Sequence, residues 1–88
     1  MTREVVVTNP LGLHARAAAR FVQTAARFTA HIRVSRDGRS VDGKSLMGVL
    51  LLAASQGTTL RIDAEGADAQ AALDALASLV AAGFGEGA

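Results

Sequence analysis

Apolar and polar residues alternate in two stretches of the chain, residues 30–35 and 59–65. A period of two is typical of a strand with one buried face and one solvent-exposed face. Residues 3–7 predict another strand because they contain three consecutive valines, and β-branched residues favour strands. Residues 39–42 predict a short strand after the hairpin turn Asp37-Gly38. The inward-facing residues of the two alternating stretches are Ala30, Ile32, Val34, Leu60, Ile62 and Ala64.

The period changes to 3.6 residues in three other stretches, which predict helices over about 15–28, 46–55 and 68–82. Gly57 follows the second of these and is a candidate C-terminal cap. The expected buried stripe of the first helix is Ala15, Ala18, Ala19, Val22, Ala25 and Ala26. That of the last helix is Ala69, Ala72, Leu73, Leu76, Leu79 and Val80.

The resulting order β-α-β-β-α-β-α predicts an α+β fold. We expect an open-faced β-sandwich, in which three helices cover one face of a four-stranded antiparallel sheet. A length of 88 residues suits one domain, so residues 1–88 are treated as a single domain. The glycine-rich end, residues 83–88, is expected to be frayed.

Composition narrows the classes of function. The chain has no cysteine and two histidines, which argues against disulfides and against a metal site. A net charge of +1 and only three aromatic residues argue against nucleic-acid binding. The longest apolar run, residues 49–54, is far too short to span a membrane. Because the first residues show no export signal, we expect a cytoplasmic protein.

The segment Asn9-Pro10-Leu11-Gly12-Leu13-His14-Ala15-Arg16 carries the candidate chemistry. It places His14 where a rigid turn meets the start of a helix, and helix N-termini bind anions through unpaired N–H groups. Arg16 adds a permanent cation that suits phosphate oxygens. A neutral His14 can act as a nucleophile there. The simpler alternative is that His14 caps the helix and Arg16 is a solvated charge.

This segment closely resembles the active-site motif of the HPr family of phosphocarriers. The segment Gly43-Lys44-Ser45-Leu46-Met47-Gly48-Val49 resembles the second signature of that family, at the family's spacing. The resemblance covers nearly the whole chain. One departure is Ala17, because many members have proline directly after the arginine, and alanine should loosen the helix start slightly.

The resemblance implies that His14 is phosphorylated on Nδ1 and that Arg16 neutralises the phosphate. It further implies that enzyme I, charged by phosphoenolpyruvate, donates the phosphoryl group, and that IIA-type proteins or domains of the sugar phosphotransferase system receive it. Such a protein is a phosphoryl carrier rather than a stand-alone enzyme, needs no cofactor, and is expected to be monomeric. The same architecture serves sugar uptake, nitrogen-linked regulation and fructose-specific relays, and the sequence leaves these pathways open.

Ser45 directly precedes an apolar helical run, so it is expected to act as an N-cap. The resemblance adds a regulatory interpretation, in which a dedicated serine kinase phosphorylates Ser45. Leu46 and Met47 stand in the first turn after it, where apolar residues are commonly core. The resemblance instead implies that they form an exposed docking patch for partners. Arg20 and Arg27 are expected to line its rim.

Two other classes of function remain. A regulatory interaction module could use the His14 and Ser45 face without carrying phosphate. A small-ligand or RNA-binding domain could share the same order of elements.

Overall fold

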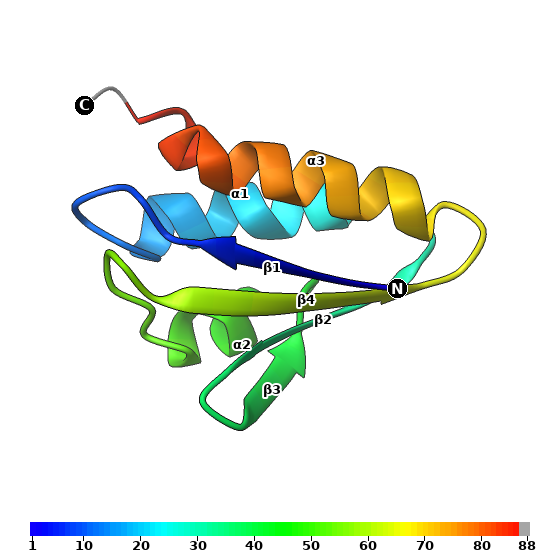
Figure 1. Cartoon of the computed structure of the whole chain (residues 1–88), viewed down its shortest axis with the longest axis horizontal. Helices are drawn as coiled ribbons and strands as arrows, with labels where there is room; N and C mark the ends of the chain where they lie inside the picture. Colours follow the sequence, from blue (N-terminus) through cyan, green and yellow to red (C-terminus); the bar gives the residue numbers. More distant parts are fainter. Residues whose placement is uncertain (87–88) are drawn as a thin grey trace.

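The structure is a computed structural model that describes residues 1–86 (Figure 1). Its strands pair antiparallel in the order β1-β4-β2-β3. The elements are β1 (Thr2–Val6), α1 (Ala15–Ala25), β2 (His31–Arg36), β3 (Arg39–Asp42), α2 (Leu46–Leu51), β4 (Thr59–Glu65), α3 (Ala69–Ala81) and a short 3-10 turn η1 (Gly83–Gly85).

One face of the sheet is buried, and its inward side chains are those that the alternation predicts. Ile32 and Val34 on β2, and Leu60, Ile62 and Ala64 on β4, are fully or almost fully buried. Helix α3 packs against β1 and β4, while α1 packs between α2 and α3 (Figure 1). The structure confirms the predicted open-faced α+β sandwich. Burial of this apolar layer is the main driving force for the fold.

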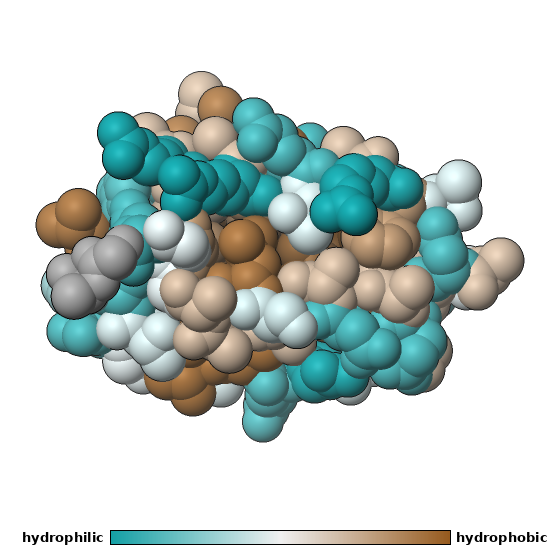
Figure 2. Space-filling model, turned by 90° about the horizontal axis from the view of Figure 1, so that it is seen from above, coloured by the Kyte–Doolittle hydropathy of each residue, from teal (hydrophilic) through white to brown (hydrophobic). Residues whose placement is uncertain are grey.

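Seen from the α3 side, pale and brown side chains run along the middle of the molecule, next to a hydrophilic band in the upper part of the view (Figure 2). Helix α3 is rich in alanine, and Ala71 and Ala81 lie on its exposed side. None of the helices in residues 1–86 has the length and apolarity of a membrane-spanning segment.

The predicted buried stripe of α1 is wrong in part. The buried residues of the helix are Ala17, Ala18, Phe21 and Ala25, whereas Ala15 and Ala26 are exposed. An alanine-rich helix offers several faces of similar hydropathy. Phe21 decides between them, because it has by far the largest apolar surface to bury and it brings Ala17 and Ala25 with it at four-residue spacing.

The first helix also ends earlier than predicted, at Ala25 rather than near Phe28. The amides of Arg27 and Phe28 donate to the carbonyls three residues earlier, at 3.2 Å each. This tighter turn is typical of a helix end. Lys44 Nζ then donates to the carbonyl of Phe28 at 2.7 Å, which ties the end of this turn to the start of the next helical region.

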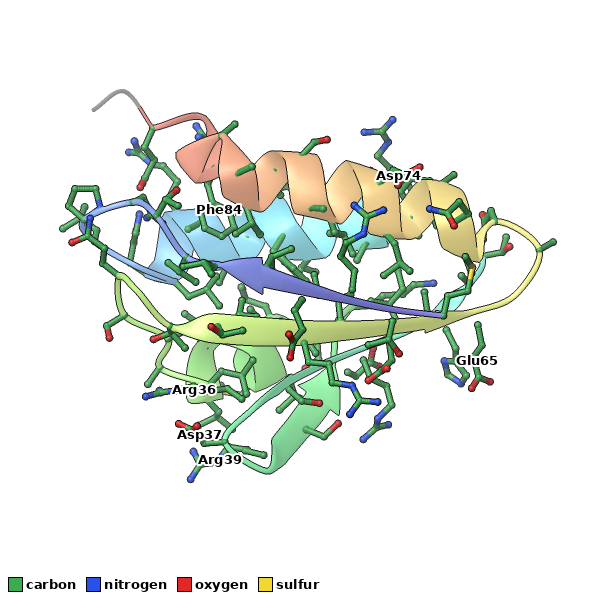
Figure 3. All side chains as sticks on the ribbon, in the orientation of Figure 1. Arg36, Asp37, Arg39, Glu65, Asp74 and Phe84 are labelled. Carbon is green, nitrogen blue, oxygen red and sulfur yellow. The ribbon has the colours of Figure 1, made fainter. Side chains whose placement is uncertain are left out.

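Helix α2 ends at Leu51, and Gly57 is not its cap, contrary to the prediction. Ala53 adopts the left-handed conformation at φ 49° that reverses the chain. Two arginines of the β2–β3 hairpin satisfy the free carbonyls at this end (Figure 3). Arg36 donates to Leu52 at 2.7 Å and to Ala53 at 2.9 Å, and Arg39 donates to Leu51 at 3.1 Å.

Residues 83–86 form a short turn that packs against the rest of the protein, in contrast to the frayed tail expected over residues 83–88. Gly83, at φ 62°, ends α3 and turns the chain back towards the core. Phe84 is fully buried and points from the end of α3 into the body of the molecule (Figure 3). Arg20 Nη1 donates to the carbonyl of Phe84. The final residues, 87–88, lie outside the described part.

Phe84→Ala should therefore destabilise the protein by about 3–5 kcal/mol, because it removes a fully buried aromatic side chain and leaves a cavity. Urea denaturation followed by circular dichroism measures the loss. Leu11→Ala is the matched control, since Leu11 is 71% exposed and its removal should change the free energy of unfolding by no more than about 0.5 kcal/mol. Equal small effects of the two substitutions would show that residue 84 is not anchored.

Candidate functional site

The turn from Asn9 to Gly12 holds its shape through one close backbone contact. Gly12 has φ 65°, and a Cβ at this position would lie 2.5 Å from the carbonyl oxygen of Ala54. Only glycine fits both the conformation and the space. The next amide, Leu13 N–H, donates to that same carbonyl at 2.8 Å, and the Leu13 side chain is buried. The segment before α1 is thus fixed against the loop after α2.

His14 is the N-cap residue of α1, with extended backbone at φ −74° and ψ 179°. Its carbonyl accepts the first helical hydrogen bond from Ala18 at 2.8 Å, but its imidazole makes no capping bond. The simple capping interpretation of the ring is therefore wrong. The first amides of α1 have no side-chain cap, and such amides at the positive end of a helix dipole favour an anion.

The ring of His14 contacts the end of the chain instead. Its Nε2 lies within hydrogen-bonding distance of Glu86 Oε2. Asn9 Nδ2 donates to the other carboxylate oxygen at 2.8 Å and also to the carbonyl of Gly12 at 2.8 Å. No hydrogen bond within residues 1–86 involves Nδ1 of His14. In a neutral ring, donation of the Nε2 proton to Glu86 leaves the free lone pair on Nδ1.

Burial acts to raise the pKa of Glu86, but other effects outweigh it and the pKa is lowered overall. The hydrogen bonds from Asn9 and His14 favour the charged carboxylate, as do the positive charges of a protonated His14 and of Arg20. Glu86 is consequently a carboxylate at neutral pH.

The three arginines on α1 differ in their surroundings. Arg16 is exposed in the first turn, and within residues 1–86 its side chain makes no hydrogen bond or ion pair. Arg20 is half-buried and bound to the carbonyl of Phe84. Arg27 is exposed and lies 5.9 Å from the centre of the Phe28 ring. Of the three, Arg16 is the one with a guanidinium available to an anion at the start of α1.

Ser45 is the N-cap of α2, as predicted: its Oγ accepts a hydrogen bond from the amide of Gly48 at 3.1 Å. Beside it, Leu46 is 44% exposed and Met47 is 68% exposed, so both lie at the surface as expected. Leu51, 57% exposed at the other end of α2, extends the apolar surface and was not predicted. Helix α2, which carries this apolar surface, packs against α1, and His14 lies at the start of α1.

Sequence reasoning missed Glu86 and the second role of Asn9. Asn9 is recognisable as a turn residue, but its buried amide also joins the turn to the end of the chain. One signal could have located Glu86: Phe84 is a large apolar residue between glycines just after a helix, and such residues often pack back against the helix end.

Comparison with known proteins agrees with this site. Residues 1–82 match the family model described as "PTS HPr component phosphorylation site". A phosphocarrier protein HPr from Cupriavidus necator is 48% identical over 87 residues, which cover 99% of this chain and 98% of the relative. A multiphosphoryl transfer protein from Escherichia coli O157:H7 is 43% identical over 91 residues, which cover all of this chain and 24% of that longer protein.

Solved structures of similar sequence share the whole fold. The structure of HPr-C-His from Thermoanaerobacter tengcongensis superimposes with a TM-score of 0.96 at 42% identity, covering 100% of this chain and 99% of that one. An HPr dimer from the same organism superimposes with a TM-score of 0.80 at 45% identity, covering 93% and 94%. The sequence match over the full length, the shared fold and the histidine at the helix start agree, and this chain belongs to the HPr family of phosphocarriers of the phosphotransferase system.

Proposed function

We propose that His14 is the residue that carries the phosphoryl group, accepting it from enzyme I and passing it to IIA-type proteins or domains. The observation that carries this proposal is the free Nδ1 of His14 at the start of α1. It lies beside amides without a side-chain cap and two residues before a guanidinium that is unpaired within residues 1–86. Nucleophile, backbone donors and cation belong to one short segment.

The chemistry follows from these parts. The lone pair of Nδ1 attacks the phosphorus of the donor's phosphohistidine, and the new N–P bond forms as the donor's N–P bond breaks. The electron pair of the broken bond returns to the donor nitrogen. The first amides of α1 and the Arg16 guanidinium offset the negative charge of the transferred oxygens. Transfer to the next protein is the same step with this chain as the donor.

The proposed docking surface consists of Leu46 and Met47, with Leu51 added by the structure. Its exposed apolar side chains suit a partner that covers them while it reaches His14. Arg20 and Arg27 on α1 remain the proposed basic rim, although Arg20 also holds the end of the chain. We keep the proposal of a monomer, which leaves this surface open to successive partners.

The finer proposal is regulation at Ser45. Its hydroxyl caps α2 directly beside Leu46 and Met47, so phosphate there would add charge at the proposed docking surface. A serine kinase would be the partner for this step.

His14→Ala should abolish acceptance of phosphate, because within the described residues no other nucleophile lies at an uncapped helix start. The gain of phosphate is measured by intact-mass spectrometry after incubation with enzyme I, Mg²⁺ and phosphoenolpyruvate. His31→Ala is the matched control, since His31 is exposed on β2 and should remain dispensable. A His14→Ala protein that still gains an acid-labile phosphate would remove His14 from this role. An unmodified wild-type protein would instead favour a purely regulatory module.

Arg16→Ala should slow transfer by about one to two decades, since a charge-assisted contact to phosphate contributes about 1.5–3 kcal/mol. Its melting temperature should hardly move, because Arg16 is exposed. Rapid-quench measurement of transfer from phospho-enzyme I gives the rate. Arg33→Ala on β2 serves as the control for loss of one exposed positive charge. A fall of less than twofold for Arg16→Ala would make it a surface charge only.

Ser45→Asp should keep stability and weaken docking, which appears as a raised apparent KM for enzyme I. Aspartate caps a helix as well as serine does, but its charge lies beside an apolar docking surface. Ser45→Ala separates the two effects. It should cost about 0.5–2 kcal/mol of stability through the lost cap and leave transfer nearly normal. An unchanged KM for Ser45→Asp at low salt would leave Ser45 as a cap without a regulatory role.

A further inference from the structure

The carboxylate of Glu86 lies against the ring that the proposed function makes reactive. It contacts Nε2 of His14, on the opposite side of the ring from Nδ1. Glu86 lies beyond residues 1–82, which match the family model, so that match assigns it no role. The contact joins positions 72 residues apart in the sequence.

Three separate contacts hold this carboxylate in place. Phe84, fully buried, fixes the chain two residues earlier, and Arg20 donates to its carbonyl. Asn9 donates to Oε1 of Glu86 at 2.8 Å, and the Asn9 side chain is itself held by the turn at Gly12. The Glu86 side chain is only 17% exposed, so solvent screens its charge less than that of a surface residue.

We propose that Glu86 is a positioning residue for phosphoryl transfer: it holds the proton on Nε2 of His14, directs Nδ1 to the phosphorus, and compensates the positive charge of the phosphorylated ring. This inference rests on the proposed role of His14.

The step balances without a further reactant. Before transfer the neutral ring donates its Nε2–H to Glu86 and keeps its lone pair on Nδ1. That lone pair forms the N–P bond while the donor's N–P bond breaks, and the proton stays on Nε2. The ring therefore gains one positive charge, which lies next to the carboxylate. Glu86 interacts more strongly with this charged ring than with the neutral ring. It therefore stabilises the transition state of phosphoryl transfer more than the state before transfer, which lowers the activation barrier.

Glu86→Gln and Glu86→Ala test the proposal together. Glutamine retains an oxygen that accepts the Nε2–H bond but lacks the charge, whereas alanine removes both. Charge-assisted hydrogen bonds are about twice as strong as neutral ones, so Glu86→Gln should lower kcat for acceptance from phospho-enzyme I roughly tenfold. The KM for enzyme I should stay unchanged, because Glu86 contacts the ring. Glu86→Ala should lower kcat at least as much.

The ring proton provides a readout that a structural role would not change. Because the pKa of Glu86 is lowered, its side chain is a carboxylate at neutral pH and can accept the Nε2 proton there. Nitrogen-15 NMR should find the proton of the neutral ring on Nε2 in the wild type, with its resonance shifted upfield in Glu86→Gln and lost to exchange in Glu86→Ala.

Glu65→Gln is the matched control, because Glu65 on β4 is paired in register with His31, the other histidine, on the exposed face of the sheet. It should leave kcat, KM and the ring proton of His14 unchanged. The inference about Glu86 would be overturned if Glu86→Gln and Glu86→Ala accepted phosphate at the wild-type rate or faster. It would also be overturned if the Nε2 proton resonance of His14 were unchanged in both variants. In either case His14→Ala would remain inactive. Phosphate acceptance by His14→Ala would instead overturn the proposed function itself.

Discussion

The site depends on the close approach of the Gly12 backbone to the carbonyl of Ala54. This carbonyl accepts the amide of Leu13, so the turn before α1 is bonded to the loop after α2. Because α1 begins immediately after this contact, the position of the turn sets where the helix starts and where the His14 ring lies. A bulkier residue at position 12 would push the two loops apart and move the ring away from its neighbours. The contact between the two loops therefore connects α1, which begins at the proposed nucleophile, with α2, which carries the proposed docking surface.

A second constraint comes from the end of the chain. Phe84 anchors residues 83–86 in the core, and Glu86 then reaches both the turn and the histidine. The ring of His14 is consequently oriented from two directions, by its own helix and by a carboxylate 72 residues away. The buried amide of Asn9 links these two supports. Preorganisation of this kind lowers the cost of reaching the transition state, since the groups need not reorganise during transfer.

Much of the fold could be predicted because local patterns dictated it. The alternation in residues 30–35 and 59–65 correctly identified the inward residues, and Asp37-Gly38 formed the expected two-residue turn, with positive φ at both positions. The sequence also located His14 at a helix start and Ser45 at a cap, because turn and cap chemistry are local. The face of α1 could not be predicted from its alanines, since the burial of Phe21 in the core decides it. Glu86 was missed because its role depends on a contact across the whole chain, which no local pattern records.

If Nδ1 of His14 receives the phosphoryl group, the phosphoprotein must carry an N–P bond at that nitrogen. Wild-type protein labelled with nitrogen-15 and phosphorylated by enzyme I and phosphoenolpyruvate can be followed by phosphorus and nitrogen NMR. We expect one phosphate, coupled through one bond to Nδ1 of His14, with a proton retained on Nε2 beside Glu86. Coupling of phosphorus to Nε2, or a phosphate on another residue, would exclude Nδ1 of His14 as the acceptor.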